Sequence, residues 1–360
     1  MYNWQHPDFP NFPFDTHRIH RALALYEQSL GTYLAEIAQL PELEQQQIHL
    51  TTTVEEGVQS SSIEGEEIAR REVQSSLLNN LRFGPDLSAP TDLRARSVAR
   101  MMEEVLRDPS DPLTEVRLRY WHELLFRNLP YPGIAGSYRS GDQPMRIVSG
   151  PEHAPTVHFE APPAERVPEL MRAFVAHLEQ PLPTVLRAGL GYLHFESIHP
   201  FSDGNGRIGR AILERMILQP IGGQPVLSIS HAIRESRDDY YQALKTAQNG
   251  FDATDWLTYF FGTLQRSIQL GRQLTQFTLQ KIRFFERFSE QLSPIQEKAL
   301  RKMWEAGPQG FTGGMTTKKY RRIHRVSAAT ASRDLHRLVK FGALEQRGAG
   351  RSTHYLLRSD

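Results

Sequence analysis

The sequence contains no cysteine, so disulfide bonds, thiolate metal sites and cysteine nucleophiles are excluded. It also lacks any apolar run near the length of about 18 residues that a membrane span requires, and we expect no membrane partner. Residues 1–7 carry neither the basic region nor the apolar region of a signal peptide. Together these absences favour a cytoplasmic protein.

The composition is that of an ordinary globular protein, but the charge is unevenly distributed. Of the 360 residues, 39% are apolar and 23% are charged, and this length suits two or three domains. The net charge of +1 conceals an asymmetry: residues 293–360 hold 14 Lys and Arg against 5 Asp and Glu, which leaves a net −8 for residues 1–292. A basic C-terminal region on an acidic body suggests a separate partner, most simply nucleic acid.

Residues 199–210, which read HPFSDGNGRIGR, concentrate more chemistry than any other stretch. The apolar run of residues 208–218 predicts a buried helix, and the turn before it gathers backbone N–H groups at the positive end of that helix. Such a place binds anions, and phosphate is the natural one. Arg207 and Arg210 lie three apart on one face and can grip the same polyphosphate. The phosphate-binding turn consists of Gly204, Asn205 and Gly206.

Two titratable groups accompany this turn. Asp203 could hold a hard cation such as Mg²⁺, which binds through one or two carboxylates and substrate phosphates. His199 is close enough to take a proton from an attacking hydroxyl. A P-loop is excluded because no G-x-x-x-x-G-K-[ST] sequence is present, and the helical spacing of residues 188–198 argues against a dinucleotide-binding fold. Phe201 is expected to anchor the loop in the core.

The same stretch matches every defined position of the Fic motif, H-P-F-x-[DE]-G-N-G-R-x-x-R, so the chain resembles the Fic-domain proteins. That family transfers the AMP moiety of ATP onto a protein hydroxyl. The resemblance implies a mainly α fold, with a Fic-type helical core and one β-hairpin flap beside the active site. It also implies ATP as substrate, Mg²⁺ at Asp203 and His199 as the catalytic base.

Residues 60–65 form a second motif. Alone, they would be a serine-rich helix end with Gly65 as the stop. Beside a Fic motif, Ser60-x-x-x-Glu64-Gly65 resembles the inhibitory motif of the family, [ST]-x-x-x-E-[GN], whose glutamate pairs with the second arginine, here Arg210. A carboxylate there would compete with the γ-phosphate for the same donors. Ser60 would hold the segment by hydrogen bonding.

Two short β-prone runs, residues 145–148 and 156–159, predict a hairpin in an otherwise helical chain. A half-exposed strand edge suits pairing with an extended peptide. By resemblance this hairpin is the Fic flap, which lays the target segment across the site. The residues that would dock the target are Val157, His158 and Phe159.

The resemblance also places Tyr240 and Gln248 near the nucleotide base and ribose, although family members commonly carry Asn where Gln248 stands. Tyr240 and Tyr241 are adjacent on a helix and point in different directions, so at most one faces the site. His194 lies five residues before His199, which is not the spacing of a helical zinc pair, and we expect a packed histidine.

The composition changes at both ends of the chain. Residues 1–14, rich in proline and aromatic residues, predict an extended arm that packs along helices; an exposed ligand motif is the alternative. We expect three domains: an N-terminal helical domain with the inhibitory helix at residues 1–88, a Fic catalytic domain at 89–292 and a C-terminal domain at 293–360.

The pattern of residues 293–360 is three helices followed by a two-stranded hairpin, which resembles a winged helix-turn-helix domain. Small polar residues from Ser327 onward suit a recognition helix that approaches base edges, and Arg347 and Arg351 on the wing suit phosphates. Winged helices also serve as protein–protein modules, so DNA is one of two candidate partners.

These features favour a protein adenylyltransferase, inhibited by Glu64, that modifies a Ser, Thr or Tyr hydroxyl of a target protein. Two alternatives stay open. The same site could use another phosphate-containing donor or remove AMP, or the chain could be a DNA-binding regulator whose Fic domain senses a nucleotide. The sequence leaves the target, the DNA site and the oligomeric state open, a homodimer included.

Overall fold

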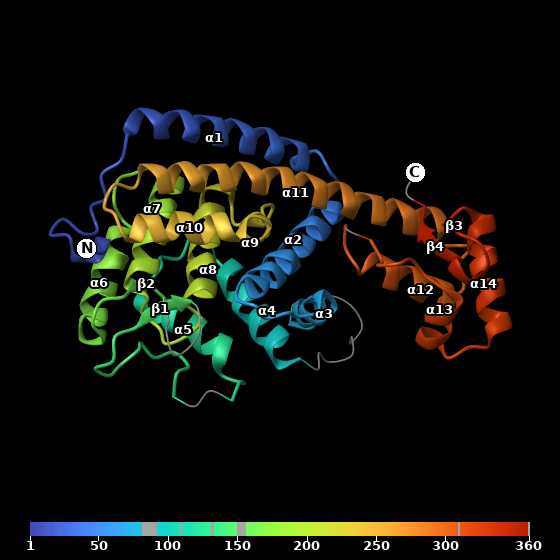
Figure 1. Cartoon of the computed structure of the whole chain (residues 1–360). Helices are drawn as coiled ribbons and strands as arrows, with labels where there is room; N and C mark the ends of the chain where they lie inside the picture. Colours follow the sequence, from blue (N-terminus) through green and yellow to red (C-terminus); the bar gives the residue numbers. More distant parts are fainter. Residues whose placement is uncertain (81–91, 109, 131–132, 150–155, 309, 359–360) are drawn as a thin grey trace. The chain divides into compact units, whose positions relative to one another are not determined.

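The computed structural model in Figure 1 describes residues 1–80, 92–108, 110–130, 133–149, 156–308 and 310–358. These residues are mainly α-helical and contain two small sheets, each of two antiparallel strands. The expected mainly α fold is therefore confirmed. Among the described helices, none combines the length and apolar character that a membrane crossing requires.

Asp15 caps the N-terminus of the first helix, because its side chain accepts hydrogen bonds from the N–H groups of His17 and Arg18. The helices are α1 Thr16–Ala38, α2 Glu42–Ile63, α3 Arg70–Asn80, α4 Leu93–Leu106, α5 Glu115–Phe126, α6 Val167–His177, α7 Thr184–Ile198, α8 Asn205–Leu218, α9 Ile229–Glu235, α10 Arg237–Gln248, α11 Thr254–Phe288, α12 Pro294–Trp304, α13 Thr317–His324 and α14 Ala328–Phe341. The strands are β1 Arg146–Ser149, β2 Thr156–Glu160, β3 Leu344–Arg347 and β4 His354–Leu357. Short 3₁₀ helices are η1 Asn3–Gln5, η2 Ala164–Arg166, η3 Gln219–Ile221 and η4 Gly350–Ser352.

The chain forms two compact units. The first comprises residues 1–40 and 49–271, and the second comprises residues 41–48 and 272–360, so α2 and α11 contribute to both. The second unit thus includes the end of α11, and the domain boundary expected at residue 293 stays a prediction. The expected boundary at residue 88 and the flap loop of residues 150–155 lie outside the described residues, as does the side chain of Arg351.

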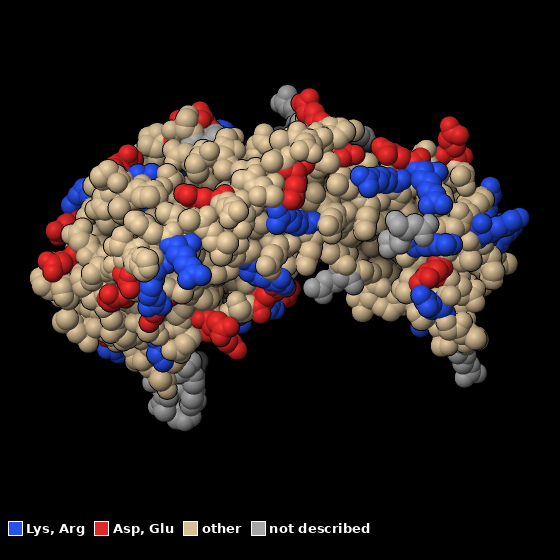
Figure 2. All heavy atoms as spheres, turned by 90° about the horizontal axis from the view of Figure 1, so that it is seen from above, with Lys and Arg blue, Asp and Glu red and all other residues tan. Residues whose placement is uncertain are grey.

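In the second unit, α12, α13, α14 and the β3–β4 hairpin share an apolar core. Ser327 caps α14 by accepting a hydrogen bond from the N–H of Thr330 at 3.1 Å, and Gly342 ends this helix at φ 80°. Leu335 and Leu338 of α14 are fully buried in the core. Figure 2 shows Lys and Arg side chains gathered over this unit, at the right of the view. The winged-helix interpretation fits this order of elements and stays a prediction.

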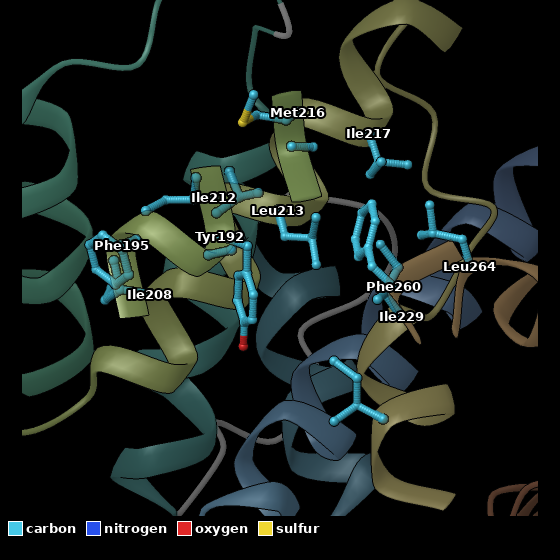
Figure 3. Packing of buried hydrophobic residues seen from close by; sticks show 14 of the residues in the cluster. Tyr192, Phe195, Ile208, Ile212, Leu213, Met216, Ile217, Ile229, Phe260 and Leu264 are labelled. Atoms are coloured by element: carbon cyan, nitrogen blue, oxygen red, sulfur yellow. The ribbon is translucent and has the colours of Figure 1, made fainter. Parts of the chain in front are cut away.

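Two consecutive helices, α7 and α8, lie in the core of the first unit. Almost all of α7 is buried, as expected for a helix that is apolar on every side. Figure 3 shows side chains of α7 and α8, such as Tyr192 and Ile212, packed together with Phe260 of α11. Gly189 allows this approach, because a Cβ there would lie 2.7 Å from the ring of Phe260. The loop of residues 199–204 is thus carried between two well-packed helices.

The arm of residues 1–14 packs against the rest of the first unit. Phe12 is buried, and the ring of Phe9 meets the ring of His194 edge to face, with centroids 4.9 Å apart. The oxygen of Pro13 accepts a hydrogen bond from the N–H of Ala253 at 2.8 Å. The arm therefore runs from α7 to the start of α11, and His194 is a packed histidine.

Candidate active site

The loop after α7 begins with a left-handed turn at His199, at φ 50° and ψ 61°. Non-glycine residues rarely adopt this conformation, so the surrounding structure must hold it. Arg139 does so: its Nε donates to the backbone oxygen of His199 at 2.8 Å, and its Nη2 donates to that of Pro162 at 2.5 Å. Sequence reasoning missed Arg139, because its partner His199 lies 60 residues along the chain and no local pattern marks it.

The middle of the loop is closed by the side chain of Asn205. Its Oδ1 accepts from the N–H of Phe201 at 2.8 Å, and its Nδ2 donates to the oxygen of Phe201 at 2.7 Å. The ring of Phe201 is fully buried, as expected for an anchor. The side chain of Asn205 is therefore committed to the loop, and its backbone N–H, at the first turn of α8, is what it can offer a phosphate.

His122 of α5 packs against the loop and forms hydrogen bonds that hold it. Its ring stacks on that of Phe201 with centroids 4.0 Å apart. Its Nδ1 accepts from the N–H of Gly136 at 3.0 Å, which leaves Nε2 to donate to the backbone oxygen of Asp203, also at 3.0 Å. Burial lowers the pKa of His122 to about 4, so the ring is neutral near pH 7. Sequence reasoning missed this residue as well.

His199 lines a cavity of about 630 Å³, and only 14% of its side chain is exposed. Burial, followed by the positive charge of Arg139, lowers the pKa of His199 to about 4. The imidazole is therefore neutral near pH 7 and can accept a proton. Its Nδ1 is buried and lies 3.8 Å from Oε2 of Glu196. Nε2 is then the nitrogen that can meet a hydroxyl.

Glu196, which sequence reasoning did not single out, also lines the cavity. It is 3% exposed, and burial raises the pKa of its carboxyl to about 8, although Arg210 opposes this. Gln248 holds the same residue from the other side, because its Nε2 donates to the backbone oxygen of Glu196 at 3.0 Å. The protonated carboxyl of Glu196 adds no charge beside His199 at neutral pH.

Arg210 is almost completely buried and is surrounded by the end of α2. Its Nε donates to Oγ of Ser60 at 2.9 Å, and its Nη2 donates both to the oxygen of Ser60 at 2.8 Å and to Oε1 of Glu64 at 2.9 Å. Burial, the largest single cause, would raise the pKa of Glu64, but the charge and hydrogen bond of Arg210 together with the charge of Arg207 outweigh it and lower that pKa. The structure thus places Ser60 and Glu64 against Arg210, in the arrangement that the sequence motif suggests.

Arg207 is paired in the same way, with a residue that sequence reasoning missed. Its Nη1 donates to Oε2 of Glu66 at 2.9 Å, and its Nη2 lies 3.5 Å from Oδ1 of Asp203. The guanidinium also lies over the ring of Phe126, 5.2 Å from its centroid. Each arginine of the motif therefore pairs with a carboxylate of the same short segment: Arg210 with Glu64 and Arg207 with Glu66.

A left-handed glycine brings these two carboxylates to α8. Gly65 has φ 80°, and the N–H of Glu66 donates to the oxygen of Ser61 at 3.0 Å, which closes the end of α2. On the other side, a Cβ at Gly206 would collide with Oε1 of Glu64. The glycine of the phosphate-binding turn therefore also leaves room for the inhibitory carboxylate.

The cavity beside His199 lies between α10, α7 and the flap. Tyr240 is buried, with its hydroxyl 2.7 Å from that of Tyr192, whereas Tyr241 is 40% exposed; both line the cavity. Gln248 lines it too, although its amide nitrogen is committed to Glu196. Tyr240 and Gln248 thus both border the cavity beside His199, and their contact with a nucleotide base and ribose stays a prediction.

The flap is formed by β1 and β2, which pair antiparallel with a register shift between Ile147 and Val148. His158 and Phe159 line the cavity. Phe159 is 1% exposed and packs inward, whereas Val157 is 41% exposed. Of the three residues expected to dock a target, Val157 therefore offers most surface, and Phe159 fixes the strand.

Asp203 is the carboxylate available to a cation. Its side chain is 56% exposed, and its Oδ1 accepts from the N–H of Gly204 at 2.6 Å. The N–H groups of Asn205 and Gly206 are therefore those left for a phosphate. No group of three or more His, Asp or Glu side chains suited to a metal occurs in the described part of the chain. Mg²⁺ needs few protein ligands when phosphates and water supply the rest, so Asp203 fits such an ion.

Known proteins resemble this chain in two regions. A model of the Fic/DOC family matches residues 112–217, and one of a domain of unknown function (DUF4172) matches residues 2–83. Over 158 residues the chain is 27% identical to a probable protein adenylyltransferase of Aquifex aeolicus, with 43% of each chain covered. Over 143 residues it is 33% identical to protein adenylyltransferase Fic of Nematostella vectensis, which covers 38% of this chain and 29% of that one. The chain thus spans less than half the length of these curated relatives.

Solved structures extend the likeness over nearly the whole chain. A Fic family protein from Desulfovibrio desulfuricans G20 superposes with a TM-score of 0.56 and 22% identity, covering 97% of this chain and 99% of that one. A Fic domain containing signaling protein from Bacteroides thetaiotaomicron has a TM-score of 0.53 at 20% identity, over 70% of this chain and 96% of that one. At such identities the likeness concerns the fold alone, and it confirms the expected Fic-type helical core.

Proposed function

This chain is a Fic-domain protein, and on that premise we propose that it transfers AMP from ATP to a Ser, Thr or Tyr hydroxyl of a target protein. The observation that carries the proposal is the placement of a neutral His199 and the first turn of α8 at one cavity of about 630 Å³. Two relatives bear the name protein adenylyltransferase, which supports transfer of an adenylyl group. The cavity is large enough for a nucleotide.

In the proposed reaction, the acceptor oxygen forms a bond to the α-phosphorus of ATP, and the bond from that phosphorus to the oxygen bridging to the β-phosphate breaks. The proton of the acceptor moves to Nε2 of His199, and pyrophosphate leaves. The N–H groups of Asn205 and Gly206, together with Arg207 and Arg210, stabilise the phosphate charge. Mg²⁺ held by Asp203 would neutralise further charge on the phosphates.

The donor and the base are tested together with labelled nucleotides. We expect Glu64→Gly to label itself with radioactive ATP, and the double variant Glu64→Gly/His199→Ala to lose on the order of 100-fold or more of this activity. Parallel reactions with UTP, GTP and CDP-choline compare the donors, and release of label from the modified protein measures AMP removal. Full activity of the double variant would show that His199 is not the base, and preferential labelling from another donor would replace ATP.

We further propose that the end of α2 inhibits the transfer reaction. A triphosphate needs both arginines of the motif, but Glu64 occupies Arg210 and Glu66 occupies Arg207, each at 2.9 Å. The two carboxylates would also repel the phosphates. Inhibition by Glu64 follows the family motif, and the pairing of Glu66 extends it to the first arginine, Arg207.

This inhibition is tested by charge removal without loss of volume. We expect Glu64→Gln and Glu66→Gln each to raise self-modification and ATP affinity, and the double variant to exceed either single one. Glu67→Gln is the matched control, because Glu67 accepts a hydrogen bond from Ser62 and pairs with neither arginine. If Glu66→Gln behaves like this control, Glu66 has no inhibitory part, whereas an unchanged Glu64→Gln would overturn the inhibition as a whole.

A second function, DNA binding by the second unit, is favoured by one observation. Residues 317–341 contain eight Lys and Arg and a single acidic residue, Asp334, whose carboxylate accepts a hydrogen bond from Oη of Tyr320 at 3.0 Å. The basic side chains of α13 and α14 are mostly exposed. A nucleic acid would neutralise this concentration of charge.

A further inference from the structure

The first residues of the chain contact the flap directly. The ring of Tyr2 meets the ring of Phe159 edge to face, with centroids 5.1 Å apart. Nε1 of Trp4 donates to the backbone oxygen of Glu160 at 2.7 Å. Both contacts fall on the end of β2 that leads away from the hairpin loop, so they fix the base of the flap rather than its tip.

Between these two residues, Asn3 ties together the helices that line the cavity. It is 1% exposed, and its Nδ2 donates to Oγ of Ser197 at 2.8 Å and to the oxygen of Ala247 at 3.2 Å. Ser197 lies two residues before His199, and Ala247 precedes Gln248. One side chain therefore bridges α7, which carries the base, and α10, which faces it across the cavity.

The flap is a small element, and part of its surface is exposed. A two-stranded hairpin is at best marginally stable by itself. Val148 and Val157 are 49% and 41% exposed, so this pair adds little burial. Besides the contacts of Tyr2 and Trp4, Nδ2 of Asn249 donates to the oxygen of His158 at 3.2 Å.

The segment of residues 2–4 is itself well anchored by the residues that follow it. The rings of His6 and Phe251 stack with centroids 3.7 Å apart. Further along, the N–H of Asp15 donates to Oγ1 of Thr254 at 2.8 Å. The segment from Tyr2 to Trp4 is therefore held by the arm that follows it, and it can hold the flap in turn.

We propose that Tyr2, Asn3 and Trp4 form a clamp that sets the position of the flap over the cavity, and so the position of the acceptor hydroxyl relative to His199. These are positioning residues, because none of them reaches the reacting atoms. The functional part of this inference rests on the proposed transfer reaction. The physical part, the restraint of β1 and β2, does not depend on that reaction.

The test uses the full chain in the Glu64→Gly background. Trp4→Phe keeps an aromatic ring and removes the N–H donor, and Asn3→Ala removes the bridge between α7 and α10. Trp256→Phe is the matched control, since Nε1 of Trp256 donates to the backbone oxygen of Gly189 at 2.8 Å, away from the flap. Hydrogen exchange of residues 146–149 and 156–160, the melting temperature, and the kcat and ATP KM of self-modification are measured for each variant.

We expect flap exchange to become about five- to tenfold faster in Trp4→Phe, as for the loss of one part-buried hydrogen bond, and faster still in Trp4→Phe/Asn3→Ala. The kcat of self-modification should fall while the KM for ATP stays within about twofold, because the phosphate site is untouched. Flap exchange equal to that of Trp256→Phe would overturn the clamp. A fall in kcat together with a similar rise in the KM for ATP would also overturn it, because that pattern indicates a general structural defect. If the Glu64→Gly background itself transfers no label, the proposed function fails, and the exchange data decide the clamp alone.

Discussion

Two buried histidines show how single side chains hold the motif loop in one arrangement. His122 must be neutral to accept from Gly136 and donate to Asp203, and His199 must be neutral to act as a base. Burial is the largest cause of the lowered pKa in both. A protein that buries such groups becomes less stable as they are protonated, because the unfolded chain takes up protons more readily.

At the scale of residues, this argument predicts a dependence of stability on pH. The pKa of His122 is about 4 in the folded protein and about 6.5 when unfolded. Between these values the unfolded state binds more protons, so the free energy of unfolding falls as pH decreases. From pH 7.5 to 5.5 the loss from His122 should be about 1.4 kcal/mol. Urea unfolding of the first unit at both pH values measures it.

The variant His122→Gln isolates this contribution. We expect it to be less stable than the wild type at pH 7.5, but to lose about 1.4 kcal/mol less on acidification. His17→Gln is the control, because His17 is exposed and should leave the dependence on pH unchanged. Equal losses in wild type and His122→Gln would mean that His122 does not carry this part of the pH response.

At the scale of elements, helices, strands and turns made of contiguous residues could be predicted from the sequence, whereas contacts between residues far apart in the chain could not. The strands expected at residues 145–148 and 156–159 appear as β1 and β2. The loop from His199 to Arg210 and its helix could also be predicted, because the turn residues and the apolar run are contiguous. His122 and Arg139 could not, since they meet the loop across 81 and 60 residues.

Glu66 is an intermediate case that the sequence could have revealed. Gly65 signals a left-handed helix end, and such an end reverses the chain so that the residues on either side of the glycine can face the same neighbour. The motif drew attention to Glu64 alone. What the sequence does not contain is the distance from this turn to α8, which depends on the packing of the helices.

The glycine at the end of α2 gives a prediction about the inhibitory segment. Gly65 has φ 80°, and a Cβ there would meet nothing within 4 Å, so Gly65→Ala is opposed by backbone conformation alone. The strain should be about 1 kcal/mol. It should loosen the turn that holds Glu64 and Glu66, and raise self-modification to a level between the wild type and Glu64→Gly.

Gly31→Ala is the control for this substitution. Gly31 lies in α1, has space for a Cβ and does not have a positive φ, so alanine should slightly stabilise the helix and leave self-modification unchanged. If Gly65→Ala is no more active than Gly31→Ala, the geometry of the helix end does not control the inhibition.

At the scale of the whole molecule, the two units carry opposite charge. The second unit, residues 41–48 and 272–360, holds 18 Lys and Arg against 9 Asp and Glu, and the first unit has an acidic excess. In the second unit, α14 presents Arg333, Arg337 and Lys340 as exposed side chains. A helix about 10–12 Å across fits a major groove about 12 Å wide, with basic side chains reaching the phosphates on either side. Binding to an acidic protein surface would not require a helix of these dimensions.

This arrangement predicts binding of the full chain to duplex DNA. We expect a labelled mixed-sequence duplex to bind at low salt, with the affinity falling on the order of 100-fold between 50 and 200 mM salt, as for about four phosphate contacts. Arg333→Ala/Arg337→Ala should weaken binding and reduce the slope of the salt dependence, because in the proposed complex both side chains would contact phosphates or base edges. Arg71→Ala/Arg172→Ala, which removes two exposed charges from the first unit, should change neither. Fluorescence anisotropy of the labelled duplex measures the affinity and its salt dependence for the wild type and for both double variants. Equal weakening by both double variants would reduce the effect to net charge, and absence of binding at 50 mM salt would leave the second unit as a protein-binding module.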